Sequence, residues 1–129
     1  RARVHLLGFR QDVGEILAES DIYLHSALAE TCTSTILESM ATGIPALVTE
    51  AGAAREQIED GRTGFVVGRD NRAGFVDRLD ELMGSPELRR RLGRAARERW
   101  AERYRVEDSA RRYHELYQRL AGLNRSPLG

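Results

Sequence analysis

The sequence predicts an α/β fold, a Rossmann-like doubly wound parallel sheet that is followed by C-terminal helices. Short apolar runs alternate with amphipathic segments over the first two thirds of the 129 residues, a pattern typical of strands and helices in a parallel sheet. Glycine and proline separate many of these segments. The last third has only helical patterns, so we expect helices there that belong to the same domain.

The first elements are read from two apolar runs and the segment between them. Residues 4–7 are apolar and end at Gly8, which predicts a buried strand. Residues 13–19 carry apolar side chains at helical spacing and are expected to form a helix. Asp21 then leads into a second apolar run at 22–25, the second expected strand.

The next helix is expected over residues 34–42. Gly43 and Pro45 follow it, and both residue types end helices. A third strand is expected at 46–48 and a short helix at 53–59. We expect one face of the helix 34–42 to be the core stripe because its apolar residues recur at about 100° per residue: Ile36, Leu37, Met40, Ala41 and Ile44.

The remaining segments complete the sheet and lead into helices. Asp60-Gly61 is read as a turn before a fourth strand at 64–67, and Pro86 stands where a first helical turn accepts proline. The helical segments are expected at 72–83, 86–103 and 107–121. We therefore divide the chain into a Rossmann-like half-domain, a helical region of the same domain and a tail, at residues 1–84, 85–123 and 124–129.

Composition excludes several classes of protein. The hydrophobic fraction of 41% and charged fraction of 31% are those of a folded globular chain. No apolar run approaches the roughly 18 to 20 residues that span a bilayer, and no signal peptide is evident, so a cytoplasmic location is expected. The single cysteine, Cys32, forms no intramolecular disulfide and has no basic neighbour to activate it. We expect no metal and no cofactor.

Charge is distributed unevenly along the chain. Residues 1–84 carry eight Arg against fourteen acidic residues, whereas residues 85–125 carry twelve Arg against six, and the chain has no Lys. Acidic residues are interleaved with these arginines, which favours a solvated helix face that also packs on another part of the protein. We expect no nucleic-acid partner.

Two glutamates, Glu30 and Glu38, stand eight residues apart across the junction from a loop to the helix 34–42. Thr33, Ser34 and Thr35 lie where that helix begins, and the free N–H groups and dipole of a helix N-terminus attract phosphate. Carboxylates accept hydrogen bonds from sugar hydroxyls. The combination predicts a nucleotide sugar as ligand, bound where open α/β sheets bind ligands, at the carboxyl ends of the strands.

Residues 4–121 resemble the second half of the C-terminal domain of retaining GT-B glycosyltransferases, in the family called glycosyl transferases group 1. The segments 26–30 and 38–45 resemble the family's E-x7-E motif and the E-A-M-A-x-G-x-P run that it enters. Further matches follow in the same order: Val48-Thr49, Gly52, Glu56, Asp60-Gly61 and 64–67. The chain departs from the pattern at Cys32-Thr33 and at Ala53, where the family has a second glycine.

The resemblance implies a role for each motif residue. Glu38 would bind the ribose hydroxyls, and backbone N–H groups at 33–35 would meet the diphosphate. Glu30 would face the donor sugar and act in catalysis, while Phe9 and Arg10 would hold the base through backbone atoms. The donor would be a UDP-, GDP- or ADP-sugar.

The resemblance also implies retention of configuration, with the donor held bent under its own diphosphate, and bacterial polysaccharide or glycoconjugate synthesis. The acceptor would be a saccharide or a lipid-linked molecule, which leaves open a peripheral membrane contact of the full-length protein. The chain begins at Arg1 rather than Met, and neither the family's basic diphosphate clamp nor its N-terminal GT-B domain is present. We therefore expect a fragment that is inactive alone.

Two other functions remain open. A sugar-nucleotide epimerase or hydrolase on the same scaffold would keep Glu38 but need an acid or base from elsewhere. A non-enzymatic doubly wound binding module would leave both glutamates without a role. Among single residues, we expect His5 to be packed in or at the edge of a strand, His25 to be a candidate ligand contact and His114 to lie on the surface. Five side chains are expected to pack between helices or on the missing domain: Trp100, Tyr104, Tyr113, Leu116 and Tyr117.

Overall fold

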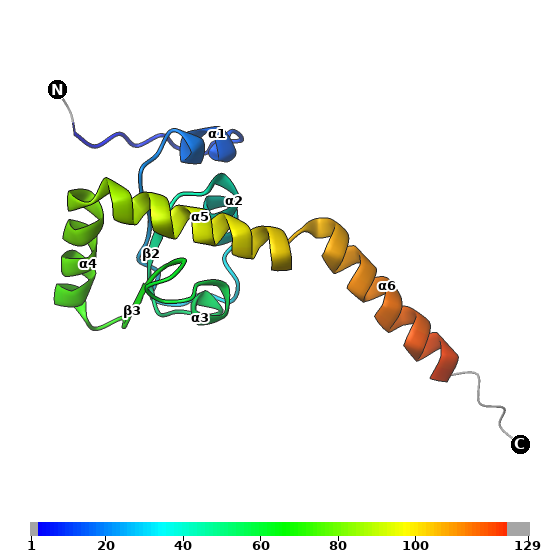
Figure 1. Ribbon diagram of the computed structural model, residues 1–129. Coiled ribbons are helices and arrows are strands. Elements are labelled where there is room, and N and C mark those ends of the chain that lie inside the picture. The colour runs from blue at the N-terminus through cyan, green and yellow to red at the C-terminus, as the bar shows by residue number, and fades with distance from the viewer. Residues whose placement is uncertain (1–2, 124–129) are drawn as a thin grey trace, which may run out of the picture.

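A three-stranded parallel sheet in the order β1-β2-β3 forms the centre of the computed structural model, which describes residues 3–123 (Figure 1). The strands are β1 (Tyr23–His25), β2 (Ala46–Thr49) and β3 (Gly64–Val67). Leu24 lies opposite Leu47, which in turn lies opposite Phe65. Helices connect the strands, so the α/β class and the parallel sheet are confirmed.

The helices lie close to where the sequence predicts them. The predicted bounds of α2, β3 and α5 are reproduced without change, and those of the other observed elements differ by one or two residues at an end. The helices are α1 (Val13–Ala18), α2 (Ser34–Thr42), α3 (Ala54–Gln57), α4 (Arg72–Gly84), α5 (Pro86–Arg103) and α6 (Val106–Leu123). As predicted, α2 ends at Gly43, whose φ of 77° is left-handed.

Helices cover both faces of the sheet, because successive strand residues point to opposite sides. Ala46 and Val48 face a core cluster that includes Ile36 and Met40 of α2 and Ala96 of α5. The other face has its own cluster, which joins the strands to α4 and to the start of α5: Leu47, Phe65, Val67, Leu82 and Leu92. The fold is therefore doubly wound, as predicted.

Helix α5 crosses the body and contributes to both clusters (Figure 1). Its contact with the end of α2 is close, since a Cβ on Gly93 would overlap the carbonyl oxygen of Gly43. Trp100 and Tyr104 pack against the cluster on the α2 side. These two aromatic residues are thus explained within this chain, without a further domain.

The predicted strand at residues 4–7 is wrong. These residues have no regular structure, and Val4 and Leu6 are 76% and 95% exposed. A strand is stabilised by hydrogen bonds to a neighbour, and no strand of the described residues lies beside this run. The prediction for His5 is wrong for the same reason, because its side chain is exposed rather than packed.

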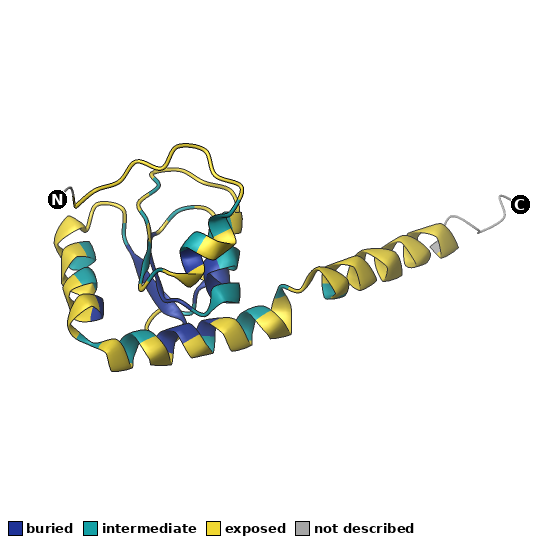
Figure 2. Ribbon diagram, turned by 90° about the horizontal axis from the view of Figure 1, so that it is seen from above, coloured by how far each residue is buried: buried dark blue, intermediate teal, exposed yellow. Residues whose placement is uncertain are grey.

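Helix α6 extends away from the body (Figure 2). Nearly all of its residues are exposed, including His114 as predicted. Tyr113 and Tyr117 stack on one another at 6.4 Å between ring centroids but contact neither core cluster. In the described part of the chain no helix combines the length and the apolar character needed to cross a membrane. The predicted tail at 124–129 lies outside the described residues.

Candidate functional site

Three loops meet at the edge of the sheet where the parallel strands end. The motif loop (residues 26–33) follows β1, the second loop (50–53) follows β2, and the third loop (68–71) follows β3. This is the edge at which open α/β sheets bind ligands. The predicted site residues from Glu30 to Glu38 lie in the motif loop and in α2, which it enters.

Two carbonyl groups of the motif loop are held from the strand and loop that follow. The Thr49 hydroxyl donates a hydrogen bond of 2.6 Å to the carbonyl of Ala27. The backbone N–H of Ala53 donates one of 2.8 Å to the carbonyl of Thr31. The last residue of β2 and the last residue of the second loop therefore both fix the path of the motif loop.

Two further carbonyls of the same loop are held by side chains. Arg69 donates from Nη1 to the carbonyl of Leu28 at 2.8 Å, and Gln57 donates from Nε2 to the carbonyl of Thr33 at 3.1 Å. Sequence reasoning missed both side chains, because each lies more than twenty residues from its partner.

These four contacts set the direction of the peptide groups. In a trans peptide the C=O of one residue and the N–H of the next point in opposite directions. Since four carbonyls point toward the groups that hold them, the N–H groups that follow them point away from those groups: those of Leu28, Ala29, Cys32 and Ser34. Outward N–H groups in a loop favour an anion.

Gly52 makes the close contact between the second loop and the motif loop possible. Its φ is 50°, and a Cβ at this position would overlap the carbonyl oxygen of Thr31 and crowd that of Glu30. Only glycine avoids both the strained backbone and the overlap. Gly52 belongs to the sequence pattern noted above, and its role here is to seat the motif loop.

The N-terminus of α2 directly follows the motif loop. Thr33 is its N-cap residue, but the Thr33 side chain makes no capping hydrogen bond. The N–H groups of Ser34 and Thr35 belong to the first turn and have no partner within the helix. Together with the helix dipole they form an electropositive end without a formal charge.

The charges of Glu30 and Glu38 both act on the phenol of Tyr23. Burial raises the pKa of Tyr23, a hydrogen bond with Thr35 lowers it, and the charges of Glu38 and Glu30 raise it further. Both carboxylates are therefore within electrostatic reach of one hydroxyl group. Glu30 lies in the motif loop just before α2, and Glu38 lies one turn into the helix.

Tyr23 joins three elements of the site. Its hydroxyl lies 2.7 Å from Thr35 Oγ1 and 3.1 Å from His25 Nδ1, and His25 Nε2 lies 3.6 Å from Glu30 Oε1. The structure thus places His25, a candidate ligand contact, against Glu30. Sequence reasoning missed Tyr23, although residues two apart on a strand share a face and this strand leads directly into the motif loop.

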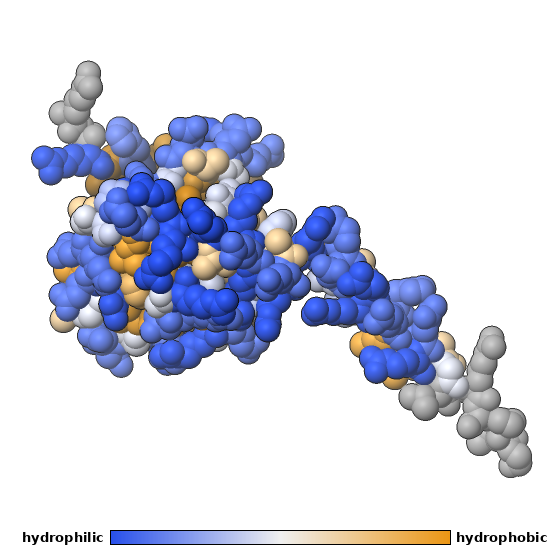
Figure 3. Space-filling view, viewed as in Figure 1, coloured by the Kyte–Doolittle hydropathy of each residue, from blue (hydrophilic) through white to orange (hydrophobic). Residues whose placement is uncertain are grey.

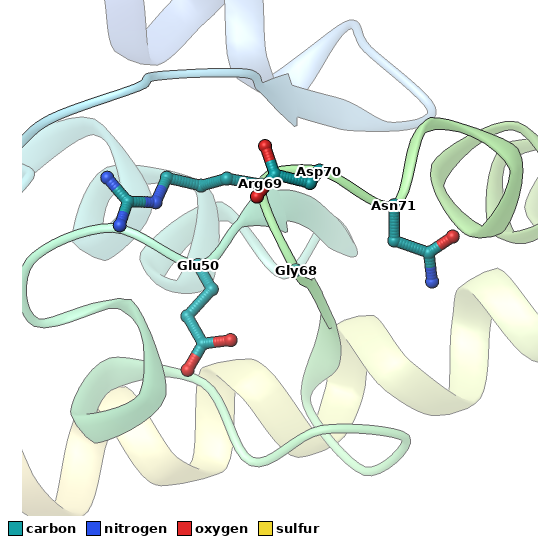
Figure 4. A pocket seen from close by; sticks show the side chains of 5 residues that line it. All are labelled: Glu50, Gly68, Arg69, Asp70 and Asn71. Carbon is teal, nitrogen blue, oxygen red and sulfur yellow. The ribbon is translucent and has the colours of Figure 1, made fainter.

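A shallow hollow of about 250 Å³ lies between the motif loop and the other two loops. Glu30, Glu50, Gly52 and Arg69 are among the residues that line it. A second, larger hollow lies beside Glu50 and the third loop, where the side chains of Glu50 and Arg69 point away from one another (Figure 4). Glu50 is held by a bidentate ion pair with Arg55, whose hydrogen bond lowers the pKa of Glu50.

Known proteins identify the chain. Residues 1–99 match the protein family described as glycosyl transferases group 1. The chain belongs to this family. Its resemblance to the family, predicted from the motif segments, is confirmed.

Two curated relatives of this group 1 chain share 35% identity with it. One is N-acetyl-alpha-D-glucosaminyl L-malate synthase of Bacillus anthracis, matched over 89% of this chain and 30% of the relative. The other is the putative glycosyltransferase EpsD of Bacillus subtilis, matched over 84% of this chain and 29% of the relative. The group 1 chain spans about a third or less of the length of these proteins.

Solved structures share the fold. HepE of Anabaena in complex with UDP superposes with a TM-score of 0.83 at 23% identity, over 87% of this chain and 31% of HepE. A glycosyltransferase of Rickettsia africae gives 0.84 at 23%, over 91% and 32%. The C-terminal domain of a group 1 protein of Francisella tularensis gives 0.68 at 27%, over 78% and 53%.

Two predicted donor-binding residues of the group 1 chain remain apart from the site. Phe9 is 91% exposed, and Arg10 is exposed and paired with Asp12. In residues 3–123 no recorded hydrogen bond or ion pair joins either of them to the motif loop. Their role in holding a base, mainly through backbone atoms, stays a prediction.

The side-chain types that bind metal ions are not clustered in the described residues of the group 1 chain. The described residues contain no group of three or more His, Cys, Asp or Glu side chains arranged to hold a metal ion. Cys32 is exposed, and its sulfur lies 3.5 Å from the Gln57 amide.

Proposed function

We propose that this chain is the donor-binding part of a retaining glycosyltransferase, which transfers a sugar from a nucleotide sugar to a saccharide or lipid-linked acceptor. One observation carries the proposal: α2 begins without a side-chain cap at the carboxyl edge of the sheet, with Glu30 in the loop before it and Glu38 one turn into it. The anionic part of a ligand would meet backbone N–H groups there, and its hydroxyl groups would meet carboxylates.

Each part of the ligand has a partner in this arrangement. The diphosphate would lie against the outward N–H groups of the motif loop and the first turn of α2, because helix N-termini and such loops favour phosphate. The ribose hydroxyls would donate to Glu38, and the hydroxyls of the sugar to Glu30. Catalysis would then consist mainly of holding the sugar while charge develops on the diphosphate.

Structural neighbours support a nucleotide sugar as donor. HepE of Anabaena was crystallised with UDP, with UDP-glucose and with UDP and glucose, and TarM of Staphylococcus aureus with UDP. These ligands belong to the neighbours. For this chain they make UDP the first probe, ahead of GDP and ADP, and the donor sugar and the acceptor remain to be identified by assay.

In the full-length protein, substitutions of the two glutamates are expected to affect the binding of different ligands. Glu38→Ala removes the acceptor of the ribose hydroxyls, so it weakens both UDP and the intact nucleotide sugar by about 1.5 to 3 kcal/mol. Glu30→Ala leaves UDP affinity unchanged, because UDP has no donor sugar. Its effect is on turnover and on affinity for the intact donor, since Glu30 orients the sugar for attack. Titration calorimetry with both ligands, paired with kinetics, measures each effect.

Glu102→Ala is the matched control, because Glu102 is an exposed glutamate on α5. It is expected to change neither affinity nor turnover. If Glu38→Ala leaves UDP affinity unchanged, or Glu30→Ala weakens UDP as much as Glu38→Ala does, the assignment of the two carboxylates is wrong. If the full-length protein binds no nucleoside diphosphate at all, the proposed function is wrong.

A further inference from the structure

The Tyr23 hydroxyl is in contact with two polar groups but has only one proton to donate. Its oxygen lies 2.7 Å from Thr35 Oγ1 and 3.1 Å from His25 Nδ1. If Tyr23 donates to His25, it must accept from Thr35, and if it donates to Thr35, it must accept from His25. The three side chains therefore form a relay that runs in one of two directions.

The far nitrogen of His25 is a buried polar atom that lacks a partner. His25 Nε2 makes no hydrogen bond within the described residues, and Glu30 Oε1 stands 3.6 Å from it. In neutral His25, a proton on Nε2 points at this carboxylate, which is the favourable arrangement. Nδ1 is then an acceptor, so Tyr23 donates to it and Thr35 donates to Tyr23. The Thr35 proton is turned inward.

Protonation of His25 reverses the relay. Both ring nitrogens of the imidazolium are donors, so Nδ1–H donates to the Tyr23 oxygen and the Tyr23 hydroxyl donates to Thr35. The proton of Thr35 is then free to turn outward. Thr35 stands in the first turn of α2, beside the N–H groups that would meet the diphosphate.

We propose that Tyr23 and His25 are positioning residues, which couple the charge of His25 to the ability of Thr35 to donate a hydrogen bond to the diphosphate of a bound nucleotide. This inference rests on the proposed function. A charged His25 directs the Thr35 proton outward and strengthens nucleotide binding, whereas a neutral His25 leaves a lone pair of Thr35 facing the anion.

The groups that face the relay come from three elements. Glu30 lies in the motif loop, Glu38 belongs to α2, and the Thr49 hydroxyl of β2 lies 3.4 Å from the backbone carbonyl of His25. Burial and the two carboxylates raise the pKa of Tyr23, so its hydroxyl keeps the proton that the relay needs. Histidine is the side chain whose charge ordinarily changes between about pH 5 and 8.

The test compares the affinity for UDP at about pH 5.5 and about pH 8 in the full-length protein, on either side of the ordinary histidine range. For each protein we take the ratio of the UDP affinity at the lower pH to that at the higher pH. We expect this ratio to be about three- to tenfold larger in the wild type than in Tyr23→Phe, which is the scale of one hydrogen bond. Ionisation of UDP itself is common to all proteins compared and cancels from this comparison. His25→Gln also loses the extra change.

Substitutions at Thr35 test the end of the relay. Thr35→Ser keeps the hydroxyl and retains the extra pH dependence, whereas Thr35→Val, of similar shape, loses it. His114→Gln is the control for histidine content, because His114 is exposed on α6 and bonded only to Gln118 in the described residues. It keeps the wild-type ratio.

The outcomes separate the relay from the proposed function. If Tyr23→Phe and Thr35→Val weaken UDP by the same factor at both pH values, these residues only support the fold and the relay is wrong, while the proposed function stands. The relay is equally wrong if His25→Gln keeps the extra change. If none of UDP, GDP and ADP binds at either pH, both proposals are overturned.

Discussion

Single residues at this site act mainly by holding backbone. Thr49, Arg69 and Gln57 each fix a carbonyl of the motif loop, and Gly52 allows the second loop to approach it. None of these four residues is required to touch a ligand. Their substitution should therefore affect binding through the position of the loop, and Gly52 offers the sharpest case.

Gly52→Ala is expected to lower the free energy of unfolding by about 2 to 4 kcal/mol, because the new Cβ overlaps backbone and its φ is strained. Overlap with the carbonyls of Thr31 and Glu30 also displaces the motif loop, so nucleotide affinity falls as well. Gly68→Ala is the control, since a Cβ there meets nothing within 4 Å and the φ is not left-handed. Urea unfolding measures both, and equal effects would contradict the packing argument.

The site residues differ in how far they could be predicted. Glu30, Glu38 and the hydroxyls between them lie close together in sequence, so their spacing alone places them around one helix N-terminus. Tyr23 reaches Thr35 across twelve residues, and Arg69 reaches Leu28 across forty-one. Such contacts depend on how the strands are ordered in the sheet, and no local pattern in the sequence carries that information.

Among the elements, helices were predicted better than strands. Apolar periodicity marks α2, Gly43 marks its C-terminal end, and Pro86 marks the start of α5. The apolar run at 4–7 carries the same local signal as a strand, yet strand hydrogen bonds come from a neighbour that the run itself cannot specify. The side chains of this run are exposed. Strand β1 is therefore an edge strand, with no further strand of the described residues beside it.

In Gly93→Ala, helix propensity and packing change the stability of α5 in opposite directions. Alanine would stabilise an open helical position by up to about 1 kcal/mol relative to glycine. Here its Cβ overlaps the Gly43 carbonyl, so α5 must move from α2, and we expect a net loss of about 2 to 3 kcal/mol. Gly14→Ala in α1 is the helical control, because a Cβ there meets nothing. It should be neutral or stabilising, and thermal unfolding distinguishes the two signs.

For the molecule as a whole, the body and α6 are energetically separate. Both core clusters are built from residues up to Tyr104, while α6 carries exposed apolar side chains that gather on one side of the helix near its C-terminal end (Figure 3). Leu116 and Leu120 are exposed leucines of this helix. The helix therefore adds no packing to the body.

Deletion of residues 106–129 is accordingly expected to leave the thermal unfolding midpoint of the body unchanged within about 2 °C, the shift that a few tenths of a kcal/mol would produce. The helical circular dichroism signal falls, because α6 is lost. A marked drop in the midpoint would show that α6 stabilises the body after all. Deletion that extends into α5, from residue 96 onward, is the contrasting variant and should abolish folding, since it removes core residues such as Ala96.

The 129-residue chain alone is expected to transfer no sugar. Its site is shallow and open to water, and electrostatic stabilisation of a departing diphosphate is weak unless water is excluded. A sensitive assay of sugar transfer, run beside the full-length protein with the same donor and acceptor, checks this. Detectable transfer by the short chain would contradict it.

The four anchored carbonyls of the motif loop also have a thermodynamic consequence. A lysine that grips phosphate gives up rotamer entropy worth about 2 kcal/mol, whereas peptide N–H groups fixed by Thr49, Ala53, Arg69 and Gln57 have lost their freedom already on folding. They also carry no formal charge. Binding of a diphosphate to this loop should therefore be opposed little by conformational entropy, and the loop's share of the affinity should change little between low and high salt.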